Sequence, residues 1–309
     1  MCTDANFKSG FVCLLGRPNA GKSTLINAIV GEKLLIASNV AQTTRHRFRA
    51  ILDADNYQMV LVDTPGIHKP KDLLGEQLNA TANNAIKDVD IIAFVLAADA
   101  QFGRGDEWII SSLSAKNAPA IMLVLNKCDL VSATAIDEQL NAAESAFANA
   151  GIPIASTLVL SALTGKHVPS FVQAALPLLP TGPRWFPQGT STDQPLEVII
   201  SEFIREKILF LTFAEVPHSI AVAVNEIEHE QKTNFYKIYA TIFVERESQK
   251  GIILGKGGSN IKLIGTHARK DLEHFLGAHV FLDLRVKLRK GWRRDVTQIR
   301  RFGYGENIC

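Results

Sequence analysis

Short apolar runs alternate with stretches of helical periodicity over the first 180 residues. Strands are expected at residues 11–15, 47–52, 58–62, 90–97, 120–125 and 156–160. Helices are expected at residues 22–30, 72–88, 105–116, 134–150 and 167–178. Apolar strands that alternate with helices are typical of an α/β fold, in which helices cover both faces of a mostly parallel sheet. Ligands of such sheets bind beyond the carboxyl ends of the strands.

The pattern changes after residue 180. Residues 183–195 are rich in Pro, Gly, Ser, Thr and Gln, which is typical of a linker. Beyond it, we expect helices at residues 196–212, 259–275 and 296–302, and strands at 219–227, 235–244 and 278–288. The sequence therefore predicts a first domain at residues 1–182, a linker at 183–195 and a smaller α+β domain at 196–309.

Charge is unevenly distributed along the 309 residues. Residues 1–182 hold 14 Lys and Arg against 16 Asp and Glu, whereas residues 246–309 hold 14 against 6. This asymmetry favours a nucleic-acid partner or an anionic membrane surface for the C-terminal end, with a merely solvated basic face as the alternative. The four cysteines have no metal-ligand spacing, and no apolar run approaches the roughly 20 residues that span a bilayer. We expect a monomeric cytoplasmic protein, with peripheral contact to the inner membrane as a secondary interpretation.

A glycine-rich segment stands between the first expected strand and its helix. It consists of Gly16, Arg17, Pro18, Asn19, Ala20, Gly21, Lys22 and Ser23. Strand, glycine-rich loop and helix are the context in which G-x-x-x-x-G-K-[ST] forms a phosphate-binding loop. Backbone amides can then surround phosphate oxygens, Lys22 can reach the β- and γ-phosphates, and the Ser23 hydroxyl can ligate Mg²⁺.

Two further segments carry candidates for the metal and the γ-phosphate. Asp63 ends a strand and can hold Mg²⁺ through water, and the amide of Gly66 can approach a γ-phosphate. Thr44 is a candidate second hydroxyl ligand, ordered by the γ-phosphate, and Thr43 beside it is the alternative. The predicted catalytic residues are Lys22, Thr44 and Gly66.

Two strand ends carry residues that select a base. The first holds Asn126, Lys127, Cys128 and Asp129, and the second holds Ser161, Ala162 and Leu163. The Asp129 carboxylate can accept two hydrogen bonds from guanine, a pair that adenine does not offer, and a backbone amide near Ala162 can reach the guanine O6. With the phosphate-binding loop, these motifs predict a site for GTP and GDP.

These motifs resemble those of the translation-factor-like GTPases, and within that class the bacterial Era family. The likeness is carried by residues 16–23, by Ala-Gln-Thr-Thr-Arg-His-Arg at 41–47 and by Asp-Thr-Pro-Gly-Ile-His-Lys-Pro-Lys at 63–71. It implies that GTP is bound by Gly16, Arg17, Pro18, Asn19, Ala20, Gly21, Lys22, Ser23, Asp63, Thr64, Pro65, Gly66, Ile67, Asn126, Lys127, Cys128 and Asp129. It also implies a switch role for Thr44 and a K⁺ ligand at Asn19.

One residue bears on the rate of hydrolysis. Ile67 follows Gly66, where Ras-like enzymes carry a water-orienting glutamine. Because an aliphatic side chain cannot orient water by hydrogen bonding, we expect slow intrinsic hydrolysis of GTP to GDP and phosphate. Backbone groups or K⁺ near Asn19 would then position the water.

A second glycine motif lies in the basic C-terminal region. Gly255, Lys256, Gly257 and Gly258 have the G-x-x-G form of a KH loop, and Lys262 and Arg269 follow on the expected helix. Backbone amides of such a loop approach a nucleic-acid backbone, and an apolar groove near Ile252, Ile253 and Ile261 could take unstacked bases. A plain strand-to-helix turn is the alternative. Farther on, Trp292 either stacks a base or packs under the last helix, and packing is favoured.

The order of elements around this loop resembles the type II KH domain of the Era family. The resemblance implies a GTP-dependent switch that binds small-subunit (16S) rRNA and acts in 30S ribosomal subunit assembly. The first alternative is a GTPase whose second domain binds protein or membrane, and the second is a constitutive RNA-binding protein with a structural nucleotide site. A preference for ATP is the third alternative.

Overall fold

The computed structural model describes residues 6–38, 40, 43–67, 70, 72–113, 119–213 and 216–304. It divides into two compact units. The N-terminal unit comprises Met1–Ala37, Thr44–Lys69 and Leu78–Asp193. The C-terminal unit comprises Ser38–Thr43, Pro70–Gln77 and Gln194–Cys309. Two short segments of the first half of the sequence therefore fold with the second half.

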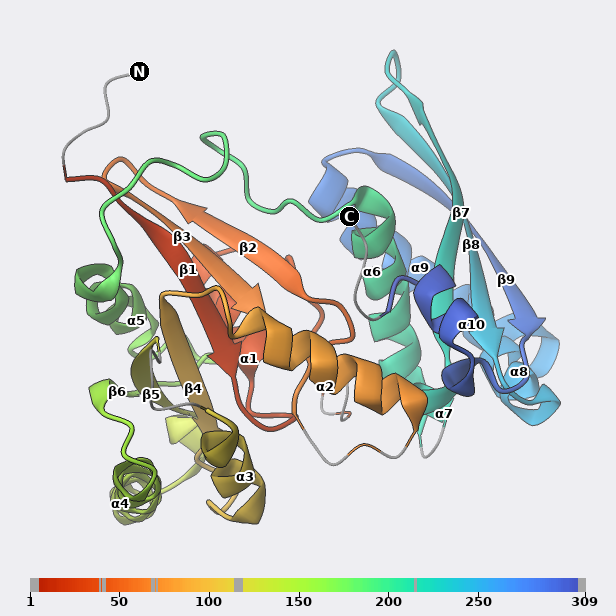
Figure 1. Ribbon diagram of the computed structural model, residues 1–309. Coiled ribbons are helices and arrows are strands. Elements are labelled where there is room, and N and C mark those ends of the chain that lie inside the picture. The colour runs from red at the N-terminus through yellow and green to blue at the C-terminus, as the bar shows by residue number, and fades with distance from the viewer. Residues whose placement is uncertain are drawn as a thin grey trace. The chain divides into compact units, whose positions relative to one another are not determined.

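A six-stranded sheet forms the centre of the N-terminal unit (Figure 1). Its strands are β1 (Lys8–Leu15), β2 (Phe48–Asp53), β3 (Tyr57–Asp63), β4 (Ile91–Ala97), β5 (Ala120–Asn126) and β6 (Ile154–Val159). They lie in the order β2-β3-β1-β4-β5-β6, and every neighbouring pair is parallel except β2 and β3. The mostly parallel sheet that the alternating pattern predicts is thus confirmed.

The helices of this unit are amphipathic segments between the strands. They are α1 (Lys22–Val30), α2 (Leu73–Ala85), α3 (Arg104–Ser112), α4 (Ala133–Asn149) and α5 (Val168–Ala175). The 3-10 turn η2 (Leu176–Leu178) extends α5 to the expected end. The helix expected at 105–116 ends earlier, at Ser112, and residues 114–116 lie outside the described part of the chain.

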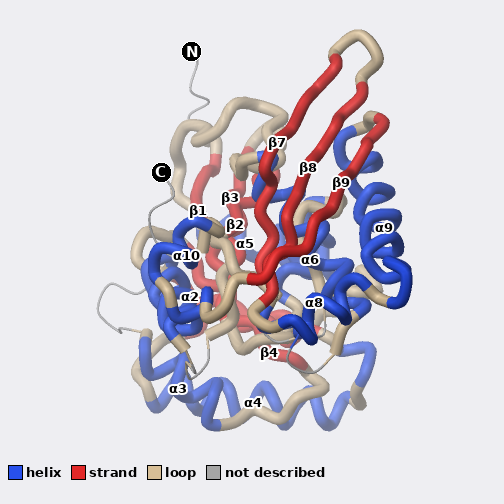
Figure 2. Tube along the Cα trace, turned by 90° about the vertical axis from the view of Figure 1, so that its right-hand side faces the viewer, coloured by secondary structure: helices blue, strands red, loops and turns tan. Residues whose placement is uncertain are grey.

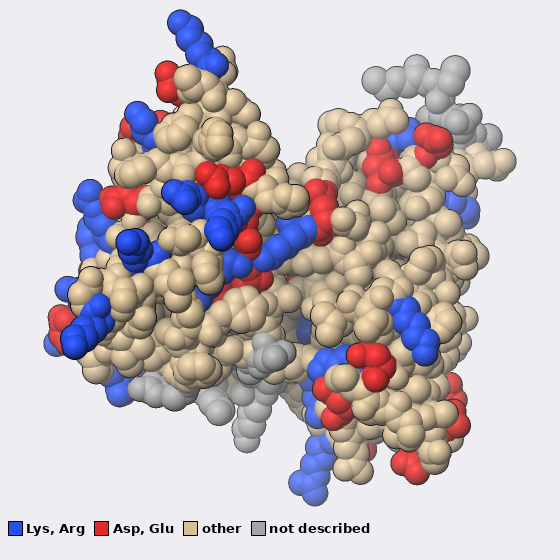
Figure 3. Space-filling view, turned by 180° about the vertical axis from the view of Figure 1, so that it is seen from behind, with Lys and Arg blue, Asp and Glu red and all other residues tan. Residues whose placement is uncertain are grey.

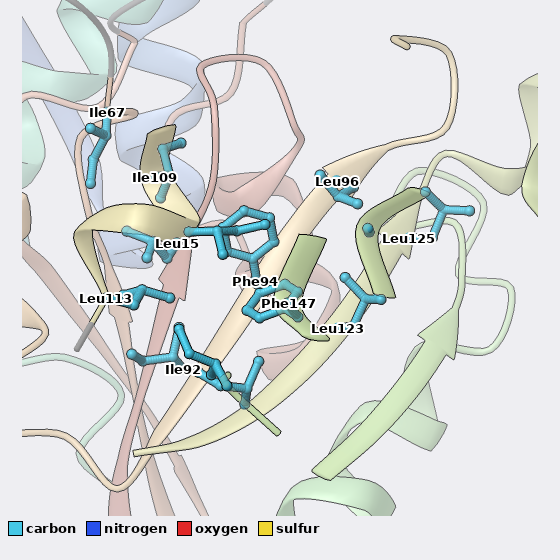
Figure 4. Close-up of a cluster of buried hydrophobic side chains, with 14 of the residues drawn as sticks. Leu15, Ile67, Ile92, Phe94, Leu96, Ile109, Leu113, Leu123, Leu125 and Phe147 are labelled. Atoms are coloured by element: carbon cyan, nitrogen blue, oxygen red, sulfur yellow. The ribbon is translucent and has the colours of Figure 1, made fainter. Parts of the chain in front are cut away.

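One hydrophobic core lies where one face of the sheet meets α3 and α4. Leu15, Phe94 and Leu123 are register partners on the neighbouring strands β1, β4 and β5, and they pack with Ile109 of α3 and Phe147 of α4 (Figure 4). The rings of Phe94 and Phe147 meet edge to face at 5.2 Å. Side chains on one strand face recur every second residue, so this packing requires the near-continuous apolar strands that the sequence shows.

The segment expected to be a linker is bonded to the N-terminal unit over most of its length. The buried Gln58 side chain accepts hydrogen bonds from the amides of Trp185 and Phe186, at 2.8 and 2.9 Å. Arg184 pairs with Asp53 at 3.0 Å. Residues 183–193 therefore belong to the N-terminal unit, although their composition is that of a flexible connection.

The C-terminal unit packs helices against a three-stranded sheet (Figure 2). Its helices are α6 (Leu196–Leu211), α7 (Val216–Ser219), α8 (Glu247–Leu254), α9 (Ser259–Leu276) and α10 (Val296–Arg301). Its strands are β7 (Ala221–Glu230), β8 (Phe235–Val244) and β9 (His279–Leu288), in the order β7-β8-β9. The first pair is antiparallel and the second is parallel. Helix α9 buries Ile264, Ala268 and Leu272, which are spaced four residues apart and so share one face.

Two helices of this unit, α8 and the four-residue α7, are absent from the sequence-based expectation. Helix α8 precedes the G-x-x-G loop, so the loop joins two helices and is not a strand-to-helix turn. The helix is short, and it contains Gly251 and the half-apolar run that follows it, which give a weak helical signal. Among the described residues, no helix is long and apolar enough to cross a membrane.

Candidate functional site

The loop after β1 has a backbone that only glycine tolerates at two points. Gly21 has φ +87°, and a Cβ there would lie 2.3 Å from Nδ2 of Asn126. A Cβ on Gly16 would lie 2.2 Å from the carbonyl oxygen of Val95. Asn19, between them, is exposed and has φ +65°. The loop can therefore lie close to the neighbouring strands while its amides remain near the start of α1.

Lys22 is held over this loop. Its side chain is buried, and Nζ donates to the carbonyl oxygens of Gly16 and Arg17, each at 3.0 Å. Burial lowers the pKa of Lys22, and the nearby Asp63 carboxylate opposes that shift. These two carbonyls are neutral partners of the Lys22 ammonium group. A phosphate bound in the loop would be a negatively charged partner.

Three oxygen-bearing side chains converge beside Lys22. Oδ2 of Asp63 accepts hydrogen bonds from Ser23 Oγ at 2.6 Å and from Thr44 Oγ1 at 3.0 Å, and the two hydroxyls are 3.0 Å apart. Oδ1 of Asp63 is buried and has no hydrogen-bond partner. Burial raises the pKa of Asp63, although Lys22 and both hydroxyls oppose the shift. A carboxylate with an unused buried oxygen and two hydroxyls is a donor set that suits Mg²⁺.

The neighbouring threonine has different contacts. Thr43 Oγ1 donates to the carbonyl of Val40 at 2.5 Å and lies 2.6 Å from Ser38 Oγ. Its own carbonyl accepts from Arg205, a fully buried residue of α6 that also pairs with Glu202 at 2.5 Å. Of the two candidates, the structure places Thr44 next to Ser23 and Asp63.

The segment after β3 approaches the phosphate loop closely. A Cβ on Gly66 would lie 2.7 Å from the backbone nitrogen of Pro18, so glycine is required there. Thr64 Oγ1 donates to the carbonyl of Leu14 at 2.9 Å, and Pro65 is buried beside it. Ile67 is 2% exposed and packs in the hydrophobic core beside α3 and α4 (Figure 4). Its side chain therefore contributes nothing polar to this end of the sheet.

Asn126 connects the phosphate loop to the two base-selecting motifs. Its Nδ2 donates to the carbonyl of Ala20 at 2.9 Å. Its Oδ1 accepts from the amide of Ala162 at 2.9 Å and from that of Lys127 at 2.8 Å. Because the Ala162 amide is used by Asn126, a guanine O6 would have to share that donor.

The other predicted base contacts lie around Asn126. Asp129 is exposed in the 3-10 turn η1 (Cys128–Leu130). The amide of the buried Cys128 donates to the carbonyl of Leu160 at 3.2 Å. Lys127 pairs with Asp99 at 3.0 Å, and Ser161 is buried. The turn thus leaves the Asp129 carboxylate open to a ligand.

One predicted phosphate-loop residue has a partner that the motif does not show. The guanidinium of Arg17 lies 3.0 Å from Oδ1 of Asp106, and it donates to the carbonyl of Gln101 at 3.1 Å. Asp106 also accepts from the amide of Gly103 at the start of α3. The Arg17 side chain therefore ties the loop to α3. No spacing in the sequence indicates this pair.

The G-x-x-G loop in the C-terminal unit exposes its central residues. Lys256 and Gly257 are exposed, and Gly255, Gly257 and Gly258 have φ of +70°, +61° and +80°. A Cβ on Gly255 would lie 2.8 Å from the amide nitrogen of Asn260, whereas nothing lies within 4 Å of one on Gly257. The loop therefore presents backbone and one lysine to solvent.

Basic side chains extend from this loop along α9. Lys262 and Arg269 are exposed and seven residues apart, which places them on one face of the helix. Figure 3 shows Lys and Arg side chains over the surface of the C-terminal unit on the side of α9. Of the three predicted groove residues, Ile252 is exposed and Ile261 is half-buried. Ile253 is fully buried in the core, so its assignment to a groove was wrong.

Trp292 packs inside the C-terminal unit and is fully buried. Its Nε1 donates to the carbonyl of Ser219 at 3.0 Å, and its ring contacts those of Phe302 and Tyr304. The favoured interpretation, packing under the last helix, is confirmed. A base could not stack on this ring without unfolding its surroundings.

Comparisons with known proteins agree with this site. A family model described as a 50S ribosome-binding GTPase matches residues 11–127, and a KH domain model matches residues 215–293. The chain is 43% identical over 302 residues to GTPase Era of Mycobacterium tuberculosis (strain ATCC 25618 / H37Rv), covering 96% of this chain and 99% of the relative. It is 42% identical over 301 residues to GTPase Era of Mycolicibacterium smegmatis, with the same coverage.

Two solved structures are similar over nearly the whole chain. One is Era in complex with MgGDPNP and nucleotides 1506–1542 of 16S ribosomal RNA, with 36% identity, a TM-score of 0.91, and coverage of 97% of this chain and 99% of that one. The other is a variant of Aquifex aeolicus Era bound to GDP·AlF4⁻, with the same identity and TM-score, and coverage of 97% and 100%.

Fold, site and family models together define a phosphate-loop GTPase that carries a C-terminal KH domain. The chain belongs to the Era family of GTPases.

Proposed function

We propose that this GTPase is a GTP-dependent switch that binds the 3′ region of small-subunit (16S) rRNA through its KH domain and acts in 30S subunit assembly. The observation that carries the proposal is the full-length likeness to Era in complex with MgGDPNP and nucleotides 1506–1542 of 16S rRNA. The exposed Lys256 and the open glycine backbone around it support it. The proposal assigns the GTPase domain to residues 1–182 and the KH domain to 196–309, joined by a linker at 183–195, of which residues up to Asp193 pack with the N-terminal unit.

Three groups of residues in the nucleotide site would bind the phosphates, select guanine and hold Mg²⁺. Amides of residues 16–23 and Lys22 bind the phosphates, and Asp129 selects guanine. Ser23, Thr44 and Asp63 would hold Mg²⁺, which supplies positive charge beside the β- and γ-phosphate oxygens. The unused Oδ1 of Asp63 supports that assignment.

Among the described residues of this site, Ile67 stands where a water-orienting glutamine would be, and it offers no polar group. Ile67 packs in the core, and the backbone of Gly66 approaches the loop at Pro18. The Gly66 amide and Thr44 would therefore act on the γ-phosphate end, and we propose slow turnover that K⁺ near Asn19 accelerates. Turnover should be several-fold faster in KCl than in NaCl at equal ionic strength. Equal rates in the two salts would remove K⁺ from the proposal.

Substitutions of two glycines that flank α9 test the RNA contact. Gly258 and Gly277 flank the helix at its two ends, with φ of +80° and +58°. A Cβ on Gly277 meets nothing within 4 Å, and one on Gly258 meets only Ile261, at 4.0 Å. Aspartate tolerates this left-handed backbone better than most residues, so Gly258→Asp and Gly277→Asp add the same charge at similar strain. Gly255 is a poorer choice because its Cβ would clash with Asn260.

The measurement is a titration of an RNA of nucleotides 1506–1542 of 16S rRNA at several salt concentrations, with GDPNP, with GDP and without nucleotide. Gly258→Asp should weaken RNA binding about tenfold or more, Gly277→Asp less than about twofold, and neither should change GTP affinity. Unchanged RNA affinity in Gly258→Asp would favour a second domain that binds protein or membrane. Equal RNA affinity in all three nucleotide states would favour a constitutive RNA-binding protein.

Cytoplasmic location, a monomeric state and peripheral contact with anionic membrane complete the proposal. The exposed basic side chains of the C-terminal unit are the support for a membrane contact. Sedimentation with vesicles that contain anionic lipid, with and without competing RNA, tests it. Pelleting that salt and RNA do not reduce would argue against an electrostatic contact through this surface.

A further inference from the structure

The segment that follows Gly66 in the sequence folds with the C-terminal unit. Residues Pro70–Gln77 belong to that unit, and they contain the start of α2 at Leu73. Gly66 itself belongs to the N-terminal unit. A short stretch of chain therefore connects the γ-phosphate end of the nucleotide site to residues that pack with the KH domain.

Asp72 holds the start of α2 with one oxygen and an arginine with the other. Its Oδ1 accepts the amide of Gly75 at 2.9 Å, which is a helix-capping bond. Its Oδ2 accepts from Nη1 of Arg293 at 3.1 Å. The position of the helix start and that of the arginine are thus coupled through a single carboxylate.

The same guanidinium holds a second carboxylate. Nε and Nη2 of Arg293 lie 2.9 and 2.8 Å from Oε2 of Glu245. The side chains of Arg293, Asp72 and Glu245 are 29%, 19% and 13% exposed, so water screens the three charges only in part. Arg293 follows the fully buried Trp292, which fixes the base of its side chain.

Glu245 leads directly to the G-x-x-G loop. Its amide and that of Arg246 donate to Oε1 of Gln249 at 2.9 and 3.0 Å, a contact that caps α8. Helix α8 is 8 residues long and ends at Leu254, and Gly255 begins the loop. One arginine therefore joins a carboxylate at the start of α2 to a carboxylate at the start of the helix that carries the RNA-binding loop.

We propose that Arg293 is a positioning residue that couples the segment after Gly66 to the G-x-x-G loop, so that a change in the position of either one affects the other. The inference rests on the proposed function, since it names how the nucleotide state would affect RNA binding. If the γ-phosphate repositions the Gly66 segment, Asp72 moves toward or away from Arg293, and the start of α8 responds through Glu245. By thermodynamic reciprocity, RNA on the loop then changes the affinity for GTP by the same factor.

Two variants remove the charge pair with little change of shape. Asp72→Asn keeps a side chain that can cap α2, and Arg293→Gln keeps a polar side chain next to Trp292. Arg294→Gln is the matched control, because Arg294 is the exposed neighbour and its loss removes the same charge from the same turn. For each protein, RNA affinity is measured with GDPNP and with GDP, and their ratio is the coupling factor. Hydrogen exchange of residues 247–258 in both states gives a second readout that needs no RNA.

Both variants should lower the coupling factor about three- to tenfold. The double variant should lower it no further than either single one, because both remove the same contact. Arg294→Gln should keep the wild-type factor. The difference in hydrogen exchange at 247–258 between the two states should shrink in the same two variants.

The outcomes separate this inference from the function on which it rests. Wild-type coupling that persists in Asp72→Asn and Arg293→Gln overturns the inference and leaves the proposed function intact. If wild-type protein shows no nucleotide effect on RNA affinity and none on exchange at 247–258, both are overturned. An equal loss of coupling in Arg294→Gln would assign the effect to net charge and would also overturn the inference.

Discussion

Replacing Asn126 by alanine should both destabilise the N-terminal unit and weaken nucleotide binding. The Asn126 side chain is 1% exposed and connects three segments that are far apart in the sequence. It bonds the carbonyl of Ala20 in the phosphate loop and the amides of Ala162 and Lys127. An alanine leaves all three main-chain groups without this partner.

The size of the effect follows from which of these groups remain buried. The bonds to Ala20 and Ala162 are both buried, at 2.9 Å each. Each buried main-chain group that loses its partner costs about 1–3 kcal/mol, so the free energy of unfolding should fall by about 2–6 kcal/mol. The Lys127 amide is partly buried and adjacent in sequence, so water can satisfy it at lower cost.

Calorimetry of the nucleotide-free protein tests this prediction, and titration with GDP tests its consequence for binding. A loss near the middle of the range, about 4 kcal/mol, corresponds to a fall in Tm of about 8–16 °C for a unit of this size. Asn141→Ala is the control, because Asn141 is exposed in α4 and its loss should change stability by less than about 0.5 kcal/mol. A loss under about 1 kcal/mol in Asn126→Ala, or unchanged GDP affinity, would refute the reasoning.

Three further changes test other parts of the structure. Burial raises the pKa of Asp63 above its ordinary 3.8, so ionising it in the folded state costs stability as pH rises through the raised pKa. Asp63→Asn should therefore be more stable than wild type at pH 7 and equal to it near pH 3, below the unfolded pKa of Asp63, in urea denaturation. GTP turnover should fall about tenfold or more, and lower stability of Asp63→Asn at pH 7 would contradict the reasoning. Trp292→Phe should lower the free energy of unfolding by about 1–3 kcal/mol, because it loses the bond to Ser219 and leaves a void, and a change below about 0.5 kcal/mol would show that the contact is dispensable. Asp129→Asn should move nucleotide preference from guanine to xanthine in competition binding, and retained GTP preference would remove Asp129 from base selection.

The fold of the N-terminal unit was predicted well because the sequence patterns of its strands and helices are local and strong. The strands of the N-terminal unit are near-continuous apolar runs between helical segments, and these patterns depend on burial alone. Helix α8 was missed because it is 8 residues long, includes a glycine and is stabilised by a cap from Gln249, a contact that no periodicity shows. Ile253 was misassigned for a related reason, since the face that a short helix buries depends on its neighbours.

Linker composition did not show with which unit the segment packs. Residues 183–193 have the polar, proline-rich composition of a linker. In the structure, Gln58 accepts hydrogen bonds from their backbone amides and Asp53 pairs with Arg184. The partners are about 130 residues away in the sequence. Pairings at such separations are decided by the sheet that brings their segments together, and single-sequence patterns carry no trace of them.

By itself, the sequence determined the chemistry of the nucleotide end. Asp63 ends a strand, Asp129 lies in the turn after another, and Lys22 and Ser23 begin the helix that follows the glycine-rich loop after β1. A parallel sheet brings its carboxyl ends to one edge whatever the details of packing. Tertiary structure alone decided which of two adjacent threonines meets Asp63, and that Arg293 lies between Asp72 and Glu245. The physical reason is range: motifs and periodicity record neighbours along the chain, whereas a hydrogen bond needs atoms within about 3 Å in space, and only the folded core sets that distance.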